Sequence, residues 1–147
     1  MGKKRVTKGR LPALPRKLWK LAQVAYDDLQ AVRRSPSYIV GMHRWHMPGL
    51  VPGTCKVCLA GAVMAKTLRA PKNLMLNPSD YPPATYRKLL ALDNVRGGDI
   101  GAACSKLGIT TLPSHLHWWR MPMYEYEPTG FMSALKSLIA ELKKENV

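Results

Sequence analysis

Acidic residues and phenylalanine are scarce in this sequence. The chain of 147 residues holds 9 Asp and Glu against 23 Lys and Arg, a formal net charge of +14, and Phe131 is its single phenylalanine. This excess of positive charge is larger than solubility requires, and its field attracts polyanions. Because aromatic residues make up only 7% of the chain, we expect a core of Leu, Ala, Val, Met and Ile.

Long apolar runs are also missing. The longest, Val57–Ala65, has nine residues, against the roughly 20 that a membrane-spanning helix needs. The basic N-terminus is not followed by the apolar segment of a secretory signal, because Arg16, Lys17 and Lys20 interrupt it. Three cysteines, an odd number, do not suggest an extracellular disulfide framework. These absences favour a cytoplasmic protein with no membrane partner.

Charge is distributed unevenly along the chain. Residues 1–79 hold 15 Lys and Arg but only two Asp, whereas residues 80–147 hold eight basic and seven acidic residues. Residues 1–13 are basic and contain no acid, which predicts a flexible arm. We expect residues 14–147 to form a single helical domain. The composition of the chain, with 46% hydrophobic and 22% charged residues, is ordinary for a globular protein.

Apolar spacing predicts a mainly α fold. We expect a compact bundle of about five helices around a buried central helix rich in Ala and Gly. The expected helices lie at 14–34, 36–46, 54–70, about 82–93 and around 131–142, with a further short one after Asp99. Residues 109–127 remain open between a loop and a short β element, with Tyr124–Glu127 as the candidate strand.

The expected central helix begins at Thr54, a good N-cap. It is apolar all round over Val57–Ala65, so it should lie in the middle of the bundle. Ala60, Gly61 and Ala62 have little or no side chain, so neighbouring helices can approach the backbone closely. Glycine costs about 1 kcal/mol of helix propensity relative to alanine, so we expect close packing to explain Gly61.

Two pairs of potential metal ligands flank a short loop. His43 and His46 are three residues apart, and Cys55 and Cys58 follow at the same spacing. On helices each pair would present two ligands on one face, as a tetrahedral zinc site requires, although the gap between the pairs is short for a zinc finger. The alternative is core packing, because His46 lies on an apolar stripe and a buried cysteine behaves as a small hydrophobe. Two hypotheses therefore remain, a protein that binds no cofactor and a protein that binds zinc.

Cys55 also admits a catalytic interpretation. In the first turn of a helix, the macrodipole and Lys56 would lower the pKa of its thiol, and His46 would serve as the base. No acid partner or oxyanion motif accompanies the pair, so we do not predict an enzyme. The same helix start, at 52–54, would offer free backbone N–H groups to a phosphate.

Residues 99–120 have a turn pattern typical of a helix-turn-helix, centred on Gly108. Two residues oppose this interpretation. Ser114 occupies the place of a buried branched residue, and Pro113 lies near the start of the second helix. An ordinary helix followed by a loop is the alternative.

The main candidate site is basic. Lys and Arg fix phosphates, and exposed aromatic residues among them stack on bases. Tyr38 and Trp45 accompany the acid-free stretch Leu29–Ser79, but both lie on an expected apolar stripe, which favours core packing. The predicted polyanion-binding residues are Lys3, Lys4, Arg5, Lys8, Arg10, Arg16, Lys17, Lys20, Arg33, Arg34, Arg44 and Lys56.

One segment carries a resemblance. Trp45-His46, followed by Cys55-Lys-Val-Cys-Leu-Ala-Gly-Ala-Val-Met-Ala65, resembles a pattern in small uncharacterised proteins encoded by tailed bacteriophages. The resemblance covers only this part of the chain. It implies a bacterial cytoplasm during infection, with a role in host takeover or counter-defence, or as a minor virion component.

We therefore expect a small, non-catalytic protein that binds nucleic acid through its N-terminal half. A protein-binding inhibitor or adaptor that docks on an acidic or nucleic-acid-handling complex is the second hypothesis, and a minor virion component is the third. Salt separates the first two, because nucleic-acid binding weakens steeply with salt, whereas a specific protein interface survives moderate salt.

Overall fold

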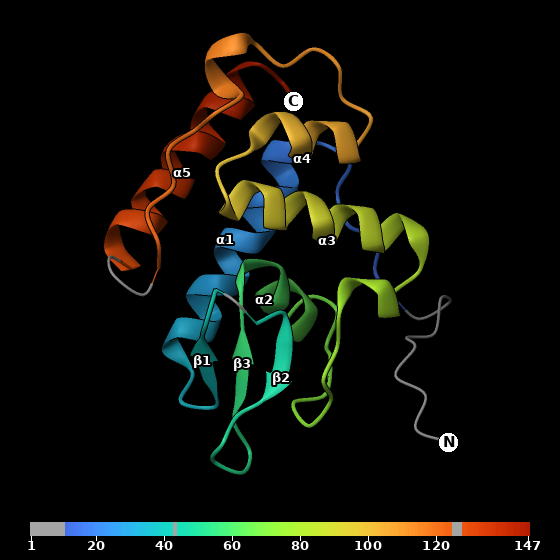
Figure 1. Ribbon diagram of the computed structural model, residues 1–147, viewed down its shortest axis with the longest axis vertical. Coiled ribbons are helices and arrows are strands. Elements are labelled where there is room, and N and C mark those ends of the chain that lie inside the picture. Colours follow the sequence, from blue (N-terminus) through green and yellow to red (C-terminus); the bar gives the residue numbers. More distant parts are fainter. Residues whose placement is uncertain (1–10, 43, 125–127) are drawn as a thin grey trace.

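The computed structural model describes residues 11–42, 44–124 and 128–147. Its helices are α1 (Leu18–Arg34), α2 (Leu59–Ala65), α3 (Pro83–Arg96), α4 (Ile100–Lys106) and α5 (Pro128–Lys144), with 3-10 turns η2 (Pro78–Asp80) and η3 (Ser114–Leu116). The strands are β1 (Tyr38–Val40), β2 (His46–Pro48) and β3 (Cys55–Val57). The predicted mainly α fold is confirmed, with the addition of a small sheet at one end of the molecule (Figure 1).

The first helix forms on the predicted apolar stripe. The buried residues of α1 are Leu18, Leu21, Ala22, Ala25, Leu29 and Val32. The helix begins at Leu18 rather than at residue 14, although Leu14 is itself buried in the core. Residues 1–10 of the predicted arm lie outside the described part of the chain, and Leu11, from the same predicted arm, packs against the core.

The helix predicted at 36–46 is wrong, because β1 and β2 occupy this segment. β1 pairs in parallel with β3, and β2 pairs antiparallel with β3, so the strand order is β1-β3-β2. The aromatic and β-branched residues of β1 suit a pleated surface. Its partner strand comes from a distant part of the sequence, and local apolar spacing does not reveal such pairing.

The helix predicted at 54–70 is shorter than expected. Its first residues form β3, and Cys58, not Thr54, is the N-cap, with its Sγ accepting a hydrogen bond from Gly61 N at 3.4 Å. Every residue of α2 is buried. A Cβ atom at Gly61 would lie 1.5 Å from the carbonyl oxygen of Trp45, so only glycine allows the backbone before β2 to approach the helix this closely.

The C-terminal half follows the prediction more closely. Asp99 Oδ1 accepts a hydrogen bond from Ala102 N at 3.0 Å and caps α4 as predicted, and α5 buries the predicted stripe from Phe131 to Leu142. Residues 109–124 contain no strand, so the β element predicted near 109–127 is absent from the described part of that segment. Residues 125–127, which belong to the candidate strand, lie outside the described residues.

Helix α1 connects the two ends of the molecule. It contacts α5, α2, α3 and β1, and Figure 1 shows it running from the end where α4 and α5 lie to the end formed by the strands. Helix α3 packs against α4. The segment before α1 passes beside α3, because Lys88 Nζ on α3 donates a hydrogen bond to the carbonyl oxygen of Leu14 at 2.6 Å.

Candidate polyanion-binding groove

A basic groove lies between the segment before α1 and the helices α3 and α4. Its cavity measures about 520 Å³. The lining residues are Arg16, Ala84, Arg87, Lys88, Ser105, Lys106, Leu107 and Gly108. Half of these residues are cations and none is an acid. The groove therefore presents positive charge on three sides, and none of its described lining residues has a carboxylate side chain to neutralise it.

The sequence of α3 and α4 explains why these cations face the groove. The buried face of α3 includes Leu89, Leu92 and Val95, which turn toward the core, whereas Arg87 is exposed. Helix α4 ends just before Gly108, which has a positive φ of 72°. This conformation favours glycine, and it places the end of α4, with Lys106, beside the cations of α3.

Lys88 and Arg16 are like charges held close together. Burial lowers the pKa of the Lys88 ammonium below its usual value, and the Arg16 guanidinium lowers the same pKa further. Lys88 donates to the backbone carbonyl of Leu14 rather than to a carboxylate. An anion bound between these two side chains would offset their repulsion, which makes this part of the groove the strongest candidate for a phosphate contact.

A second cavity extends the groove toward the C-terminal residues. It measures about 370 Å³ and shares Arg16, Leu107 and Gly108 with the first cavity. It adds Lys17, which donates a hydrogen bond to Asn146 Oδ1. It also adds the hydroxyl groups of Thr110 and Thr111. The basic groove, defined by Arg16, Lys17, Arg87, Lys88 and Lys106, thus combines cations and hydroxyl groups, the groups that contact nucleic-acid phosphates.

The structure separates the predicted polyanion-binding residues. Arg16 and Lys17 lie in the basic groove. Lys20 Nζ lies 5.5 Å from the centre of the Trp19 ring, and Lys143 Nζ lies 5.1 Å from the same ring. Arg33 and Arg34 are exposed at the end of α1, Arg44 lines a different cavity and Lys56 lies on β3. Lys3, Lys4, Arg5, Lys8 and Arg10 lie outside the described residues.

Three groove cations, Arg87, Lys88 and Lys106, were missed by the sequence prediction. The near-neutral total for residues 80–147 concealed them. A local signal was present, because residues 81–92 and 100–124 contain no acid. The acids of this half lie in other segments of the sequence, and in the described part of the chain none of them forms an ion pair with a groove cation.

The predicted metal ligands meet only in part. His43 lies outside the described residues. His46 Nδ1 lies 2.8 Å from the carbonyl oxygen of Leu74 and therefore donates to it, which leaves Nε2 as an acceptor 3.5 Å from Cys55 Sγ. Cys58 Sγ instead lies 3.9 Å from the carbonyl oxygen of Trp45. Among the residues the structure describes, no group of three or more His, Cys, Asp or Glu side chains could hold a metal ion.

The catalytic interpretation of Cys55 rested on a helix start that does not exist. Cys55 lies in β3 and is fully buried, so no helix dipole acts on its thiol. Burial raises the pKa of this thiol above its usual value, which disfavours the reactive thiolate. The phosphate site predicted at 52–54 is wrong for the same reason, because these residues belong to the β2–β3 turn and precede no helix.

The helix-turn-helix pattern at 99–120 is also wrong. α4 forms the first helix, but the second is reduced to the single 3-10 turn η3. Pro113 directly precedes η3, and its ring disfavours the helical conformation at Leu112, so the turn does not extend toward its N-terminus. The segment has no recognition helix within its described residues, so sequence reading by this motif is not supported.

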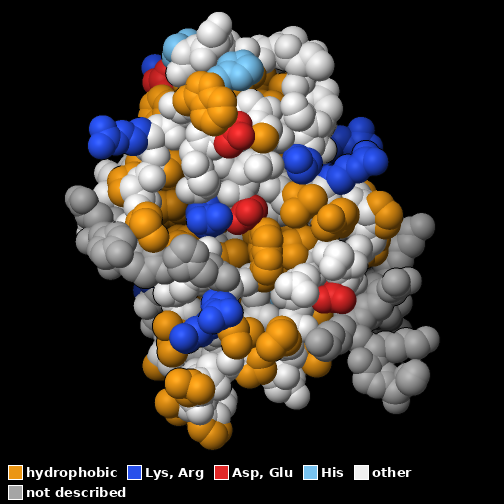
Figure 2. All heavy atoms as spheres, viewed as in Figure 1, with side chains coloured by type: hydrophobic (Ala, Val, Ile, Leu, Met, Phe, Trp, Pro, Cys, Tyr) orange, Lys and Arg blue, Asp and Glu red, His pale blue; other side chains and the backbone are white. Residues whose placement is uncertain are grey.

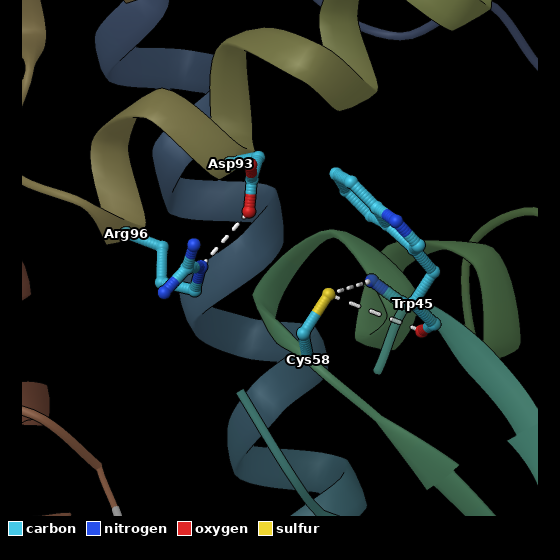
Figure 3. Close-up of polar contacts among 5 residues, drawn as sticks. Trp45, Cys58, Asp93 and Arg96 are labelled. Carbon is cyan, nitrogen blue, oxygen red and sulfur yellow. Dashed lines mark hydrogen bonds and ion pairs between the residues drawn. The ribbon is translucent and has the colours of Figure 1, made fainter. Parts of the chain in front are cut away.

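The segment from Trp45 to Ala65 forms close contacts around one carbonyl group. The carbonyl oxygen of Trp45 accepts hydrogen bonds from both the amide and the thiol of Cys58 and lies against Gly61. Figure 3 shows Asp93 and Arg96, an ion pair on α3 at 2.8 Å, beside Trp45 and Cys58. These residues line a cavity of about 190 Å³. These residues therefore hold the sheet, α2 and α3 together.

No protein-family model, curated protein or solved structure matches this chain. Within the described residues, no helix is both long and apolar enough to cross a membrane.

Proposed function

We propose that this chain is a non-catalytic nucleic-acid-binding protein that holds backbone phosphates in the basic groove. The observation that carries the proposal is that five cations line the groove and no acidic residue is among the described lining residues. Burial and the nearby Arg16 both disfavour the charged form of one of these cations, Lys88. A polyanion would supply the compensating charge that the side chains of the described lining residues do not. The proposal involves no cofactor.

The proposal modifies the expectation that binding depends on the N-terminal half alone. Arg16 and Lys17 belong to that half, and Leu14, whose carbonyl accepts the hydrogen bond from Lys88, follows directly after the predicted basic arm in the sequence. Arg87, Lys88 and Lys106 belong to the other half. From the resemblance of one segment to phage proteins we also propose that the protein acts in a bacterial cytoplasm during infection.

A charge-reversal variant tests the proposal. Arg16→Glu, Arg87→Glu and Lys106→Glu together change three exposed groove residues, and we expect them to weaken binding to labelled DNA and RNA of unrelated sequences. Each lost phosphate contact lowers the slope of log affinity against log salt by about one, so the slope should fall by about three. Fluorescence anisotropy over a series of salt concentrations measures this slope.

The matched control is Lys66→Glu, Arg69→Glu and Lys72→Glu. It makes the same change in net charge at three exposed residues outside the groove. We expect this control to retain the slope of the unmodified protein. Equal losses in both variants would mean that net charge alone drives binding, and no loss in either would mean that the groove is not the binding site.

A further inference from the structure

The outer face of the sheet and the turn between β2 and β3 form an exposed apolar surface, which we call the strand face. Ile39, Lys56 and Met47 lie side by side across the three strands. Ile39 is 44% exposed, while Leu50 and Val51 in the turn are 97% and 62% exposed. Figure 2 shows hydrophobic side chains gathered over this end of the molecule. Exposed aliphatic side chains that gather at one end of a molecule are typical of an interaction site.

Hydrogen bonds hold the turn that carries the two most exposed of these side chains. Gly49 N donates to the Thr54 carbonyl at 2.9 Å, and both the amide and the hydroxyl of Thr54 donate to the Val51 carbonyl, at 3.1 and 2.6 Å. Gly53 has a φ of 82°, which favours glycine and closes the turn. The turn therefore presents Leu50 and Val51 in a fixed conformation, which lowers the entropy cost of binding.

The charge around the strand face selects the kind of partner. No acid occurs between Leu29 and Ser79, a stretch that contains all three strands and α2. Lys56 lies at the centre of the strand face, between Ile39 and Met47. Arg44 and Lys72 are exposed in the same acid-free stretch. A complementary partner surface would carry apolar side chains surrounded by carboxylates.

The exposed side chains also argue against nucleic acid as the occupant. Binding to single strands uses aromatic rings on which bases stack, and Ile39, Leu50 and Val51 are aliphatic. The basic groove, in contrast, is cationic and includes hydroxyl groups. The strands and α4 lie toward opposite ends of the molecule in Figure 1, so the two surfaces would act on different partners.

We propose that the strand face is a docking surface for a protein segment that combines acidic and apolar side chains. Leu50 and Val51 would enter an apolar depression of the partner, and Lys56 would pair with a carboxylate. This proposal is independent of the groove. With both surfaces occupied, the chain would connect a nucleic acid to an acidic protein.

Three labelled peptides test the docking proposal on the full chain. One repeats leucine and glutamate, the second repeats leucine and lysine, and the third repeats serine and glutamate. We expect the leucine–glutamate peptide to bind at least about tenfold more tightly than either of the others, since only it supplies both apolar burial and negative charge. Fluorescence anisotropy measures the affinities for the peptides. Binding to anionic lipid vesicles and self-association of the chain are measured in parallel.

Variants of the strand face locate the binding. Leu50→Ser with Val51→Ser, and separately Lys56→Glu, should each weaken binding of the leucine–glutamate peptide by about tenfold. At physiological salt, where screening limits the effect of charges outside the groove, neither should change nucleic-acid affinity by a comparable factor. Met123→Ser is the control, because Met123 is 47% exposed but lies outside the strand face. All of these side chains except Lys56 are exposed, so a thermal melt should confirm that the fold is retained.

Four results would overturn the docking proposal. The first is a leucine–glutamate peptide that binds no more tightly than one of the other two peptides, and the second is binding that the strand-face variants leave unchanged. The others are preference for the anionic vesicles and self-association that the Leu50 and Val51 substitutions abolish. The groove variant changes none of the strand-face residues. If it fails to weaken nucleic-acid binding, that result would therefore count against the proposed function and not against the docking proposal.

Discussion

Asp28, on α1, has a carboxyl group whose pKa burial raises. Burial, assisted by the neighbouring Asp27, raises its pKa from 3.8 to about 6, against the lowering effect of a hydrogen bond from the Thr67 hydroxyl. That hydroxyl donates to Asp28 Oδ2 at 2.5 Å. The folded protein therefore binds a proton more tightly than the unfolded chain between pH 3.8 and about 6, so the stability associated with Asp28 is present at acid pH and is lost as pH rises through this window.

Asp28→Asn should stabilise the protein at neutral pH and not at acid pH. The amide carries no charge to desolvate and can still accept the Thr67 hydrogen bond, so the free energy of unfolding at pH 8 should rise by on the order of 1 kcal/mol after allowance for solvent screening. Urea unfolding at pH 8 and pH 4 measures the difference between variant and wild type.

Asp27→Asn provides the comparison, because it removes the same charge from an exposed position of α1. His46 contributes a pH dependence of opposite sign, since burial lowers its pKa and stability falls as pH falls below its usual value of 6.5. The contribution of His46 cancels when variant and wild type are compared at one pH. A gain from Asp28→Asn that is the same at both pH values would contradict the burial argument.

At the scale of elements, the sheet and α2 are joined at the Trp45 carbonyl group. The closest approach is at Gly61, where an added Cβ would lie 1.5 Å from the carbonyl oxygen and 2.7 Å from the carbonyl carbon. Both atoms belong to the backbone, so no side-chain rotation relieves the contact. The strand segment and the helix would have to separate.

Gly61→Ala should therefore destabilise the protein by more than the range of about 1–3 kcal/mol usual for overpacking. Gly97→Ala is the matched control, because its added Cβ would lie 3.7 Å from the nearest atoms and its φ of −81° is ordinary for alanine. The control should be neutral or stabilising by about 0.4–1 kcal/mol. Thermal and urea unfolding compare the two variants, and equal stability would disprove the close contact.

The elements that the sequence predicted well are those with local signals. α1 and α5 follow apolar stripes at helical spacing, and Asp99 marks the start of α4. The three strands were missed because each has only three residues and depends on pairing with a distant segment. Tyr38, Ile39, Met42 and Trp45 happen to fall at helical spacing, and the hydrogen bonds of β1 with β3 outweigh that weak local preference.

At the scale of the whole molecule, positive charge is poorly compensated. The ion pairs found within the described residues are Asp93–Arg96 and Glu141–Lys144, each within a single helix. The candidate groove was predicted in part, because Arg16 and Lys17 come from the strongly basic half. Its other cations were not, because a sum over half the chain does not tell which residues the fold brings together. Self-repulsion of a net charge of +14 should destabilise the compact state.

Raising the salt concentration should therefore stabilise the free protein. Between 0.01 M and 0.15 M salt the Debye length falls from about 30 Å to about 8 Å, and we expect the melting temperature to rise by about 2–4 °C for each 1 kcal/mol of repulsion removed. The groove variant Arg16→Glu, Arg87→Glu, Lys106→Glu reduces the net charge to +8, six units below the natural +14, and should show a smaller rise.

Differential scanning calorimetry in potassium chloride measures both melting temperatures. A wild-type melting temperature that falls with added salt would mean that favourable ion pairs outweigh the repulsion. If the groove variant is more stable than the wild type at low salt while binding nucleic acid less well, the groove is a place where binding is favoured at the expense of stability.

The shared carbonyl of Trp45 has a consequence for how the molecule opens. Because one oxygen receives the Cys58 amide and thiol and also touches Gly61, β2 cannot leave the sheet without uncovering the first turn of α2, and α2 cannot fray from that end while the strand stays in place. Amide protons of the two elements should then exchange with deuterated solvent at a common rate, as one cooperative unit.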